Sequence, residues 1–100
     1  MKESEIEEKL VKGIKGLGGI AYKFVSPGNI GVPDRLIILP GGKIFFIELK
    51  AEKGRLSQIQ KYQIKRIRSL GAEVLVVRGS IGVTALLDAC RDYMGEGQER

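Results

Sequence analysis

The chain has 100 residues, of which 43% are hydrophobic and 29% are charged, and these values fit a single globular domain with a modest core. It contains one cysteine, Cys90, and no histidine, which excludes an internal disulfide framework, the usual zinc ligand sets, and Ser-His-Asp or Cys-His catalysis. The net charge of +5 is concentrated in residues 9–68, where 13 lysines and arginines stand against three acids, and a net +10 indicates either a polyanion-binding surface or a well-solvated one.

The first predicted element is a helix over residues 4–17. Apolar residues recur in it at helical spacing, at Ile6, Leu10, Val11, Ile14 and Leu17. Ser4 followed by Glu7 matches a capping box, and Glu7 also falls inside the apolar stripe, where an acid needs a partner. The charged start lacks the apolar region of a signal peptide, and no apolar run approaches the roughly 18 residues of a membrane span. We therefore expect a cytoplasmic protein with no membrane partner.

Three strands follow in the prediction. Residues 20–25 alternate as a strand, and residues 26–31 form a loop rich in glycine and proline. Two β-rich runs, 35–39 and 43–50, are separated by Pro40-Gly41-Gly42, which is typical of a tight hairpin turn. In the loop, glycines allow close approach to a phosphate, and the alternative is a plain surface turn.

The hairpin register decides which side chains meet. If the turn has three residues, Leu39 faces Lys43 and Asp34 faces Glu48, with their Cβ atoms roughly 4.5–5.5 Å apart. Lys50 lies two residues beyond Glu48 and so shares its face. A two-residue turn would shift this pairing by one.

The second half of the chain predicts a helix, a strand and a helix. Ser57 is a good N-cap for a helix to about residue 70, and Gln60 falls on its apolar stripe. Residues 73–77 are typical of a buried strand. Residues 83–94 form an amphipathic helix in which Cys90 is a core residue, and the chain frays after it. The prediction is an α/β fold of order α-β-β-β-α-β-α, in one domain over residues 1–95 with a tail at 96–100.

The paired acids suggest metal chemistry. Adjacent carboxylates repel each other, and a divalent cation removes that conflict. Mg²⁺ takes oxygen ligands and commonly uses one or two carboxylates. A lysine beside them can act on the attacking water or neutralise charge on a phosphate. The alternative is an ordinary strand edge with a salt bridge.

The motifs also resemble a known family. Gly31-Val32-Pro33-Asp34 followed by Glu48-Leu49-Lys50 is similar to the PD-(D/E)-x-K nuclease signature. With Glu7 in the leading helix and the run Gly54–Gln60 after the lysine, the set resembles the virus-type replication–repair nuclease (VRR-NUC) family. The resemblance covers residues 4–78.

The resemblance implies a restriction-endonuclease-like α-β-β-β-α-β core with a mixed sheet flanked by helices, to which this chain adds a C-terminal helix. It implies Mg²⁺ or Mn²⁺ held by Asp34, Glu48 and the Leu49 carbonyl. Lys50 would act on water, Gln60 would support the site, and Glu7 would complete the acidic cluster as a further ligand. Stand-alone members resemble junction-resolving enzymes and are expected to be homodimers.

The leading hypothesis is thus a metal-dependent endonuclease for branched DNA such as a four-way (Holliday) junction, from a phage or a prophage-bearing bacterium. Basic residues flanking the site are expected to contact phosphates: Lys12, Lys23, Arg35, Lys53, Arg55 and Lys61. The alternatives are a nuclease without branch preference, a non-catalytic DNA-binding module and a structural interaction domain.

Overall fold

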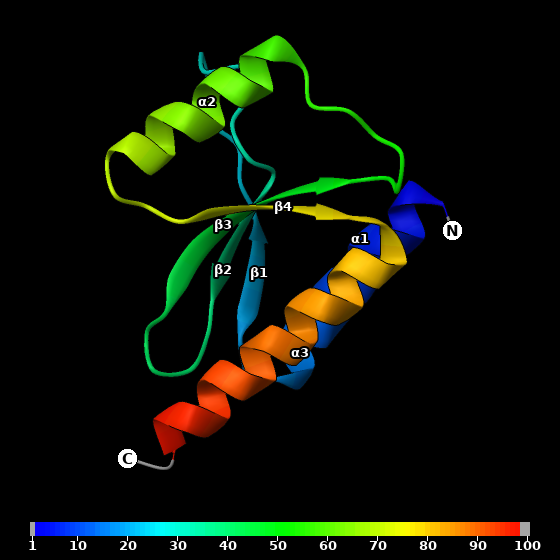
Figure 1. Cartoon of the computed structure of the whole chain (residues 1–100), viewed down its shortest axis with the longest axis vertical. Helices are drawn as coiled ribbons and strands as arrows, with labels where there is room; N and C mark the ends of the chain where they lie inside the picture. The colour runs from blue at the N-terminus through cyan, green and yellow to red at the C-terminus, as the bar shows by residue number, and fades with distance from the viewer. Residues whose placement is uncertain (1, 99–100) are drawn as a thin grey trace.

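A computed structural model describes residues 2–98 of the chain (Figure 1). One four-stranded sheet has the order β1-β2-β3-β4, with β1, β2 and β3 antiparallel and β4 parallel to β3. The elements in chain order are α1 (Glu3–Gly16), β1 (Ile20–Lys23), β2 (Arg35–Ile38), β3 (Ile44–Lys50), α2 (Gln58–Ser69), β4 (Val74–Arg78) and α3 (Gly79–Gln98). The predicted order and the mixed sheet flanked by helices are confirmed.

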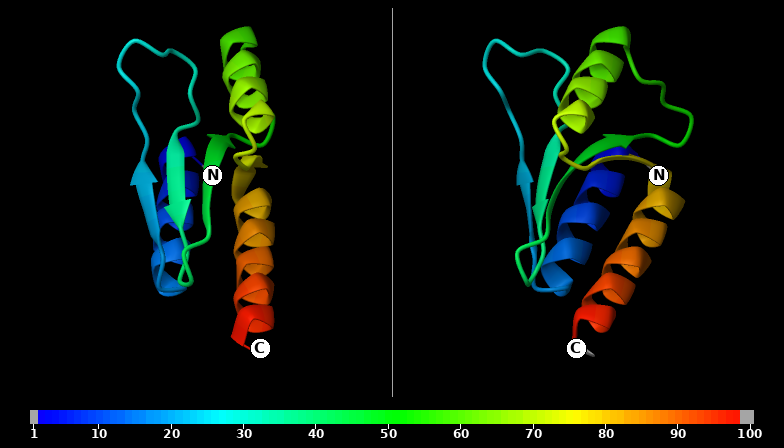
Figure 2. Two further views of the ribbon diagram at one scale, coloured as in Figure 1. Left: turned by 90° about the vertical axis from the view of Figure 1, so that its left-hand side faces the viewer. Right: turned by 60° about the vertical axis from the view of Figure 1, so that its left-hand side comes forward.

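The main core lies between the sheet and the pair α1 and α3, which run side by side (Figure 2, right). Leu10 and Ile14 of α1 are fully buried, as are Ile37 and Ile47 of the central strands. Val83 of α3 completes this layer, and Cys90 is buried in it as predicted. Each large aliphatic side chain buried here stabilises the fold by roughly 1.5–3 kcal/mol before entropy is counted.

The opposite face of the sheet is covered in part by α2. This helix packs beside β3 and β4 on the side of the sheet away from α1 and α3 (Figure 1). Alternation along the strands puts Phe46, Glu48 and Val74 on this face, since their neighbours Ile47 and Leu49 point into the main core. The face is therefore partly apolar and partly polar, and the polar part carries the candidate site.

The hairpin has the predicted register. Ile38 pairs with Ile44, Leu36 pairs with Phe46, and the amide of Leu39 donates to the carbonyl of Lys43 over 2.8 Å. The turn is thus three residues long, and continuing the same register beyond β2 sets Asp34 opposite Glu48.

The start of α1 differs from the prediction. Lys2 is the N-cap, without a side-chain hydrogen bond, and Ser4 lies inside the helix. The predicted capping box is therefore wrong. The Glu7 carboxylate accepts a hydrogen bond from Arg35 of β2 instead, since a charged donor is a stronger partner than a backbone N–H.

The last helix is longer than predicted. It begins at Gly79 rather than at residue 83. Gly79, with a positive φ of 64°, turns the chain out of β4, and Gly82 lies within the helix close to Val77. It continues to Gln98, so residues 96–98 of the predicted tail are helical, and residues 99–100 lie outside the described part. Among the described residues, no helix is long and apolar enough to cross a membrane.

Candidate active site

Asp34 stands at the entry to β2, where the backbone is already fixed. Its carbonyl accepts a hydrogen bond from the Phe24 amide over 2.8 Å. Its side-chain Oδ1 accepts the Leu49 amide of β3 over 3.0 Å. The carboxylate therefore bridges the two strands beside Glu48, as the hairpin register requires.

Glu48 is the one buried acid among the described residues, with 4% of its surface exposed. Its Oε2 lies 3.8 Å from Lys50 Nζ, and Gln60 Nε2 donates to the same oxygen over 3.4 Å. The structure thus brings together the predicted acid, the predicted lysine and the predicted glutamine.

Gln60 reaches the site from the first turn of α2. Its side-chain Oε1 accepts a hydrogen bond from the backbone amide of Ser57 over 2.9 Å, while the backbone amide of Gln60 donates to Ser57 Oγ over 3.2 Å. This is a capping box, and it confirms Ser57 as the predicted N-cap. Because the Gln60 side chain also donates to Glu48, the start of α2 is fixed to the site.

The pKa values of both Asp34 and Glu48 are raised, as expected for two neighbouring carboxyl groups that are partly or fully buried. Burial raises the pKa of Glu48 to about 7, and the negative charge of Asp34 adds to that rise, while Lys50 opposes it. Burial also raises the pKa of Asp34, and the Leu49 amide lowers it. A second positive charge between these carboxylates would favour their ionised forms.

Glu7 approaches the site from α1 through Arg35. The Arg35 guanidinium pairs with Glu7 Oε1 and also donates to the Ala21 carbonyl over 3.1 Å. The negative charge of Glu7 is a minor cause that raises the pKa of Asp34. Arg35, with 12% of its side chain exposed, is committed to these protein contacts.

The donor set fits a hard divalent cation. Asp34 and Glu48 each have one oxygen held by a protein donor, and the second oxygen accepts no hydrogen bond from another described residue. Such cations prefer carboxylate oxygens of this kind. No group of three or more acids, histidines or cysteines in residues 2–98 forms a ready metal cluster, so Glu7 stands outside the pair. The Leu49 carbonyl remains a predicted ligand.

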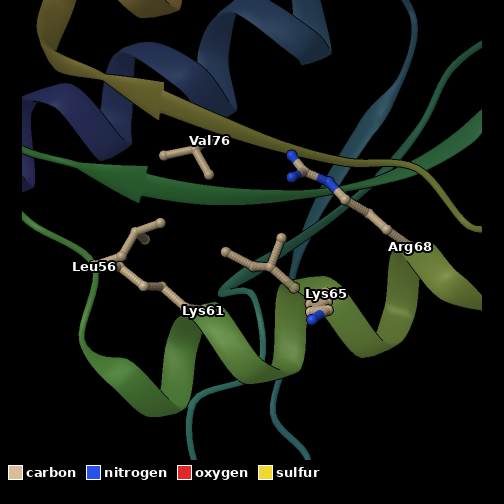
Figure 3. Close-up of a pocket in the computed structure, with 6 residues that line it drawn as sticks. Leu56, Lys61, Lys65, Arg68 and Val76 are labelled. Atoms are coloured by element: carbon tan, nitrogen blue, oxygen red, sulfur yellow. The ribbon is translucent and has the colours of Figure 1, made fainter.

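Apart from Arg35, the predicted phosphate-binding residues lie in the loop between β3 and α2, on α2, on β1 and on α1. Lys53 and Arg55 are exposed in the loop between β3 and α2, beyond Lys50. Lys61 lines a shallow hollow with Leu56, Lys65 and Arg68 on the side of α2 that faces β4 (Figure 3). Lys23 is exposed, and Lys12 pairs with Glu8 over 2.6 Å.

Arg78 is a neighbour of the site that the sequence did not indicate. It pairs with Lys50 in the parallel register and therefore lies on the same face. Its Nε donates to the Gly54 carbonyl over 3.2 Å, which ties the loop of Lys53 and Arg55 to β4. Arg78 reaches Lys50 only because β3 pairs with β4, and the whole of α2 separates these two strands along the chain.

Gly31 has a different role from the expected approach to a phosphate. It has a φ of 89°, and a Cβ atom built on it would lie 2.9 Å from the backbone of Ile59 in α2. The Gln63 side chain also donates to the Ile30 carbonyl over 3.2 Å. The loop thus packs on α2, and the missing side chain serves that contact.

Comparison with known proteins adds three findings. Residues 4–81 match the VRR-NUC domain family. A protein of Acyrthosiphon pisum secondary endosymbiont phage 1, named "Putative nuclease p44", is 48% identical over 77 residues, which are 77% of this chain and 83% of that protein. A solved structure described as a VRR_NUC domain superposes with a TM-score of 0.80 and 33% identity, over 86% of this chain and 94% of that one.

Proposed function

The chain belongs to the VRR-NUC family of nucleases, and from this premise we propose that it is a metal-dependent DNA endonuclease with its active site at Asp34, Glu48 and Lys50. One observation carries the assignment. Glu48 is buried against Asp34 with a pKa raised to about 7, yet it is held in place by Lys50 and Gln60. Such a perturbed acid with specific partners is typical of a functional site.

The reaction is hydrolysis of a phosphodiester. A water oxygen attacks phosphorus and gives up a proton to solvent, the bond from phosphorus to the leaving oxygen breaks, and the leaving oxygen takes up a proton. Lys50 Nζ orients the attacking water or neutralises charge on the phosphate. Gln60 keeps the Glu48 carboxylate oriented toward the site.

Asp34 and Glu48 would hold the divalent cation, Mg²⁺ with Mn²⁺ as a substitute, and the Leu49 carbonyl would be a further ligand. Such an ion stabilises negative charge in the transition state and lowers the pKa of water. Glu7 adds negative charge beside the pair. Lys53, Arg55, Lys61 and the more distant Lys12 and Lys23 bind phosphates. Arg35 is removed from that set, because its guanidinium is occupied within the protein.

Preference for branched DNA is the finer part of the proposal. It is supported by the likeness of stand-alone family members to junction-resolving enzymes. A homodimer would present two such sites to one junction, which suits paired cuts. The phage origin of the 48% identical relative supports work in the cytoplasm of a bacterial or phage-infected cell. We propose that the described residues form one domain that includes the whole of α3.

The test is incubation of the chain with supercoiled plasmid, linear duplex and a mobile four-way junction, in Mg²⁺, Mn²⁺ or EDTA. Glu48→Ala and Lys50→Ala are compared with Asp88→Asn, which removes an exposed acid on α3. We expect cutting that needs metal, is lost in the first two variants and survives in the third. Faster cutting of the junction than of the duplex supports the finer proposal.

Two results would redirect the assignment. Equal cutting of junction and duplex would favour a nuclease without branch preference. Binding of DNA without cutting, in every metal, would favour a non-catalytic DNA-binding module and would remove the catalytic role of Lys50.

A further inference from the structure

Arg35 is a cation placed next to a site that must attract another cation. It directly follows Asp34 in the chain and pairs with Ile47 of β3. Its charge and that of Glu7 both act on the Asp34 carboxyl. A positive charge at this position weakens the attraction for a metal ion by simple Coulomb repulsion. Its presence there therefore calls for a compensating role.

The contacts of Arg35 define that role. One end of the guanidinium donates to the Ala21 carbonyl of the edge strand β1, over 3.1 Å. The other end pairs with Glu7 Oε1 of α1. Arg35 is 12% exposed while Glu7 is 44% exposed, so the arginine is the fixed partner and the glutamate is the one that needs holding. A planar guanidinium that is bound to the backbone at one end holds a carboxylate at its other end better than the single ammonium of a lysine would.

Resting on the proposed function of the Asp34–Glu48 site, we propose that Arg35 is a positioning residue that holds the Glu7 carboxylate beside that site, and that it is not a phosphate contact. Glu7 has one oxygen on the guanidinium, and its other oxygen accepts no hydrogen bond from the described residues. The pattern repeats that of Asp34 and Glu48, where a protein donor holds one oxygen and leaves the other available.

The direction in which metal affinity changes when Arg35 is removed separates a positioning role from a purely electrostatic one. Removing a cation next to a metal site strengthens metal binding if charge alone matters. Removing the residue that holds Glu7 weakens metal binding, because the freed Glu7 carboxylate no longer keeps its negative charge beside the site. In a Glu7→Gln background there is no carboxylate to hold, so loss of Arg35 then acts only through its charge.

The experiment measures Mn²⁺ affinity by isothermal titration calorimetry on the full chain without DNA. The variants are Arg35→Lys, Arg35→Met, Glu7→Gln and the double variant Arg35→Met with Glu7→Gln. Arg91→Lys is the matched control, since Arg91 also pairs with an acid but lies on α3, with Asp88. Thermal unfolding identifies any variant that does not fold, and Arg35→Lys keeps the charge if Arg35→Met fails.

We expect Arg35→Met and Arg35→Lys to weaken Mn²⁺ binding by about tenfold, because the Coulomb attraction of a fixed Glu7 carboxylate is lost. In the Glu7→Gln background, we expect Arg35→Met to cause no further loss. The salt dependence of DNA binding in EDTA, by fluorescence anisotropy, should keep its wild-type slope in Arg35→Met. Arg91→Lys should bind Mn²⁺ as the wild type does.

Unchanged or tighter Mn²⁺ binding in Arg35→Met would overturn the positioning role, as would an equal loss with and without Glu7. A salt slope reduced by about 0.9 would identify Arg35 as a phosphate contact instead. If the wild-type chain binds no Mn²⁺, the proposed function and this inference fail together. Normal Mn²⁺ binding and DNA cutting in every Arg35 variant would overturn this inference alone.

Discussion

Gln60 Nε2 donates to Glu48 Oε2 over 3.4 Å from a side chain that simultaneously closes the capping box of α2. One glutamine therefore couples the start of a helix to the orientation of a buried acid. Its oxygen faces the Ser57 amide while its nitrogen faces Glu48, so both ends of the carboxamide are used. Loss of this side chain should affect both stability and cleavage, and the two effects can be separated.

Gln60→Ala should lower the free energy of unfolding by roughly 1 kcal/mol through the lost cap. It should also lower the cleavage rate by about 10–100-fold, because Glu48 loses an orienting donor. Ser57→Ala removes the hydroxyl of the same cap but leaves the Gln60 carboxamide, so it should share the stability loss and keep most of the rate. Urea unfolding and plasmid cutting measure the two effects. Equal rate losses in both variants would mean that helix fraying, not Glu48 orientation, slows the enzyme.

Without metal, stability should fall as pH rises. The folded pKa of Glu48 is raised from 4.5 to about 7, first by burial and then by the Asp34 charge. Between these values the folded chain keeps a proton that the unfolded chain releases, so this contribution is full below pH 4.5 and is lost as pH rises through about 7. A rise of this size corresponds to roughly 3 kcal/mol.

Thermal unfolding in EDTA from pH 5 to 8 tests this. Glu48→Gln should flatten much of the pH dependence and should unfold at a higher temperature than the wild type at pH 8. Glu8→Gln is the control, since Glu8 is an exposed acid whose pKa is lowered by Lys12. Parallel curves for the wild type and Glu48→Gln would contradict the raised pKa.

The hairpin and the site it carries could be predicted because their determinants are local. Pro40-Gly41-Gly42 indicates a tight turn, and with the three-residue form, which the structure confirms over a two-residue one, strand alternation places Leu36 opposite Phe46. The same register continues outward and places Asp34 opposite Glu48. Lys50 is two residues beyond Glu48 and therefore lies on the same face of the strand.

The features that the sequence did not reveal all depend on distant partners. Glu7 fits a capping box locally, but its carboxylate pairs with Arg35, 28 residues away. Arg78 reaches Lys50 only through parallel pairing across α2. The sequence pattern predicts that the last helix begins at residue 83, yet Gly79 lies against Glu52 and Gly82 lies against Val77, and α3 begins at Gly79. Local pattern cannot report a contact whose partner lies elsewhere in the chain.

The contact of Gly31 with α2 leads to a stability prediction. Gly31→Ala should destabilise the fold, because a Cβ atom there would lie 2.9 Å from the Ile59 backbone and φ is positive. Gly41→Ala is a matched control, since Gly41 has a φ of 91° and open space around it. The loss in free energy of unfolding of Gly41→Ala therefore gives the cost of placing alanine at a positive φ without a steric clash, which is about 1–2 kcal/mol.

Urea unfolding of both variants gives the difference, which measures the steric term alone. We expect Gly31→Ala to lose clearly more stability than Gly41→Ala. We also expect it to slow cleavage, since any shift of Ile59 moves Gln60. Equal losses in the two variants would show that the loop yields freely and that Gly31 is needed only for its backbone angle.

The last prediction concerns the exposed cations beyond Lys50. Lys53 and Arg55 lie in the loop that Arg78 ties to β4 through Gly54. If both contact phosphates, the variant Lys53→Ala with Arg55→Ala should weaken binding to every DNA sequence alike. Each lost phosphate contact should make the slope of log affinity against log salt shallower by about 0.9.

The matched control is Lys43→Ala with Arg91→Ala, which removes the same charge away from the site. Lys43 lies at the hairpin end of β3 and pairs with Glu73, and Arg91 pairs with Asp88. Fluorescence anisotropy in EDTA at several salt concentrations compares the two double variants. The first should lose about 1.8 from its slope, because two contacts are removed, and the second should keep the wild-type slope. Identical slopes in both would mean that net charge alone draws DNA to the chain and that the loop does not contact its phosphates.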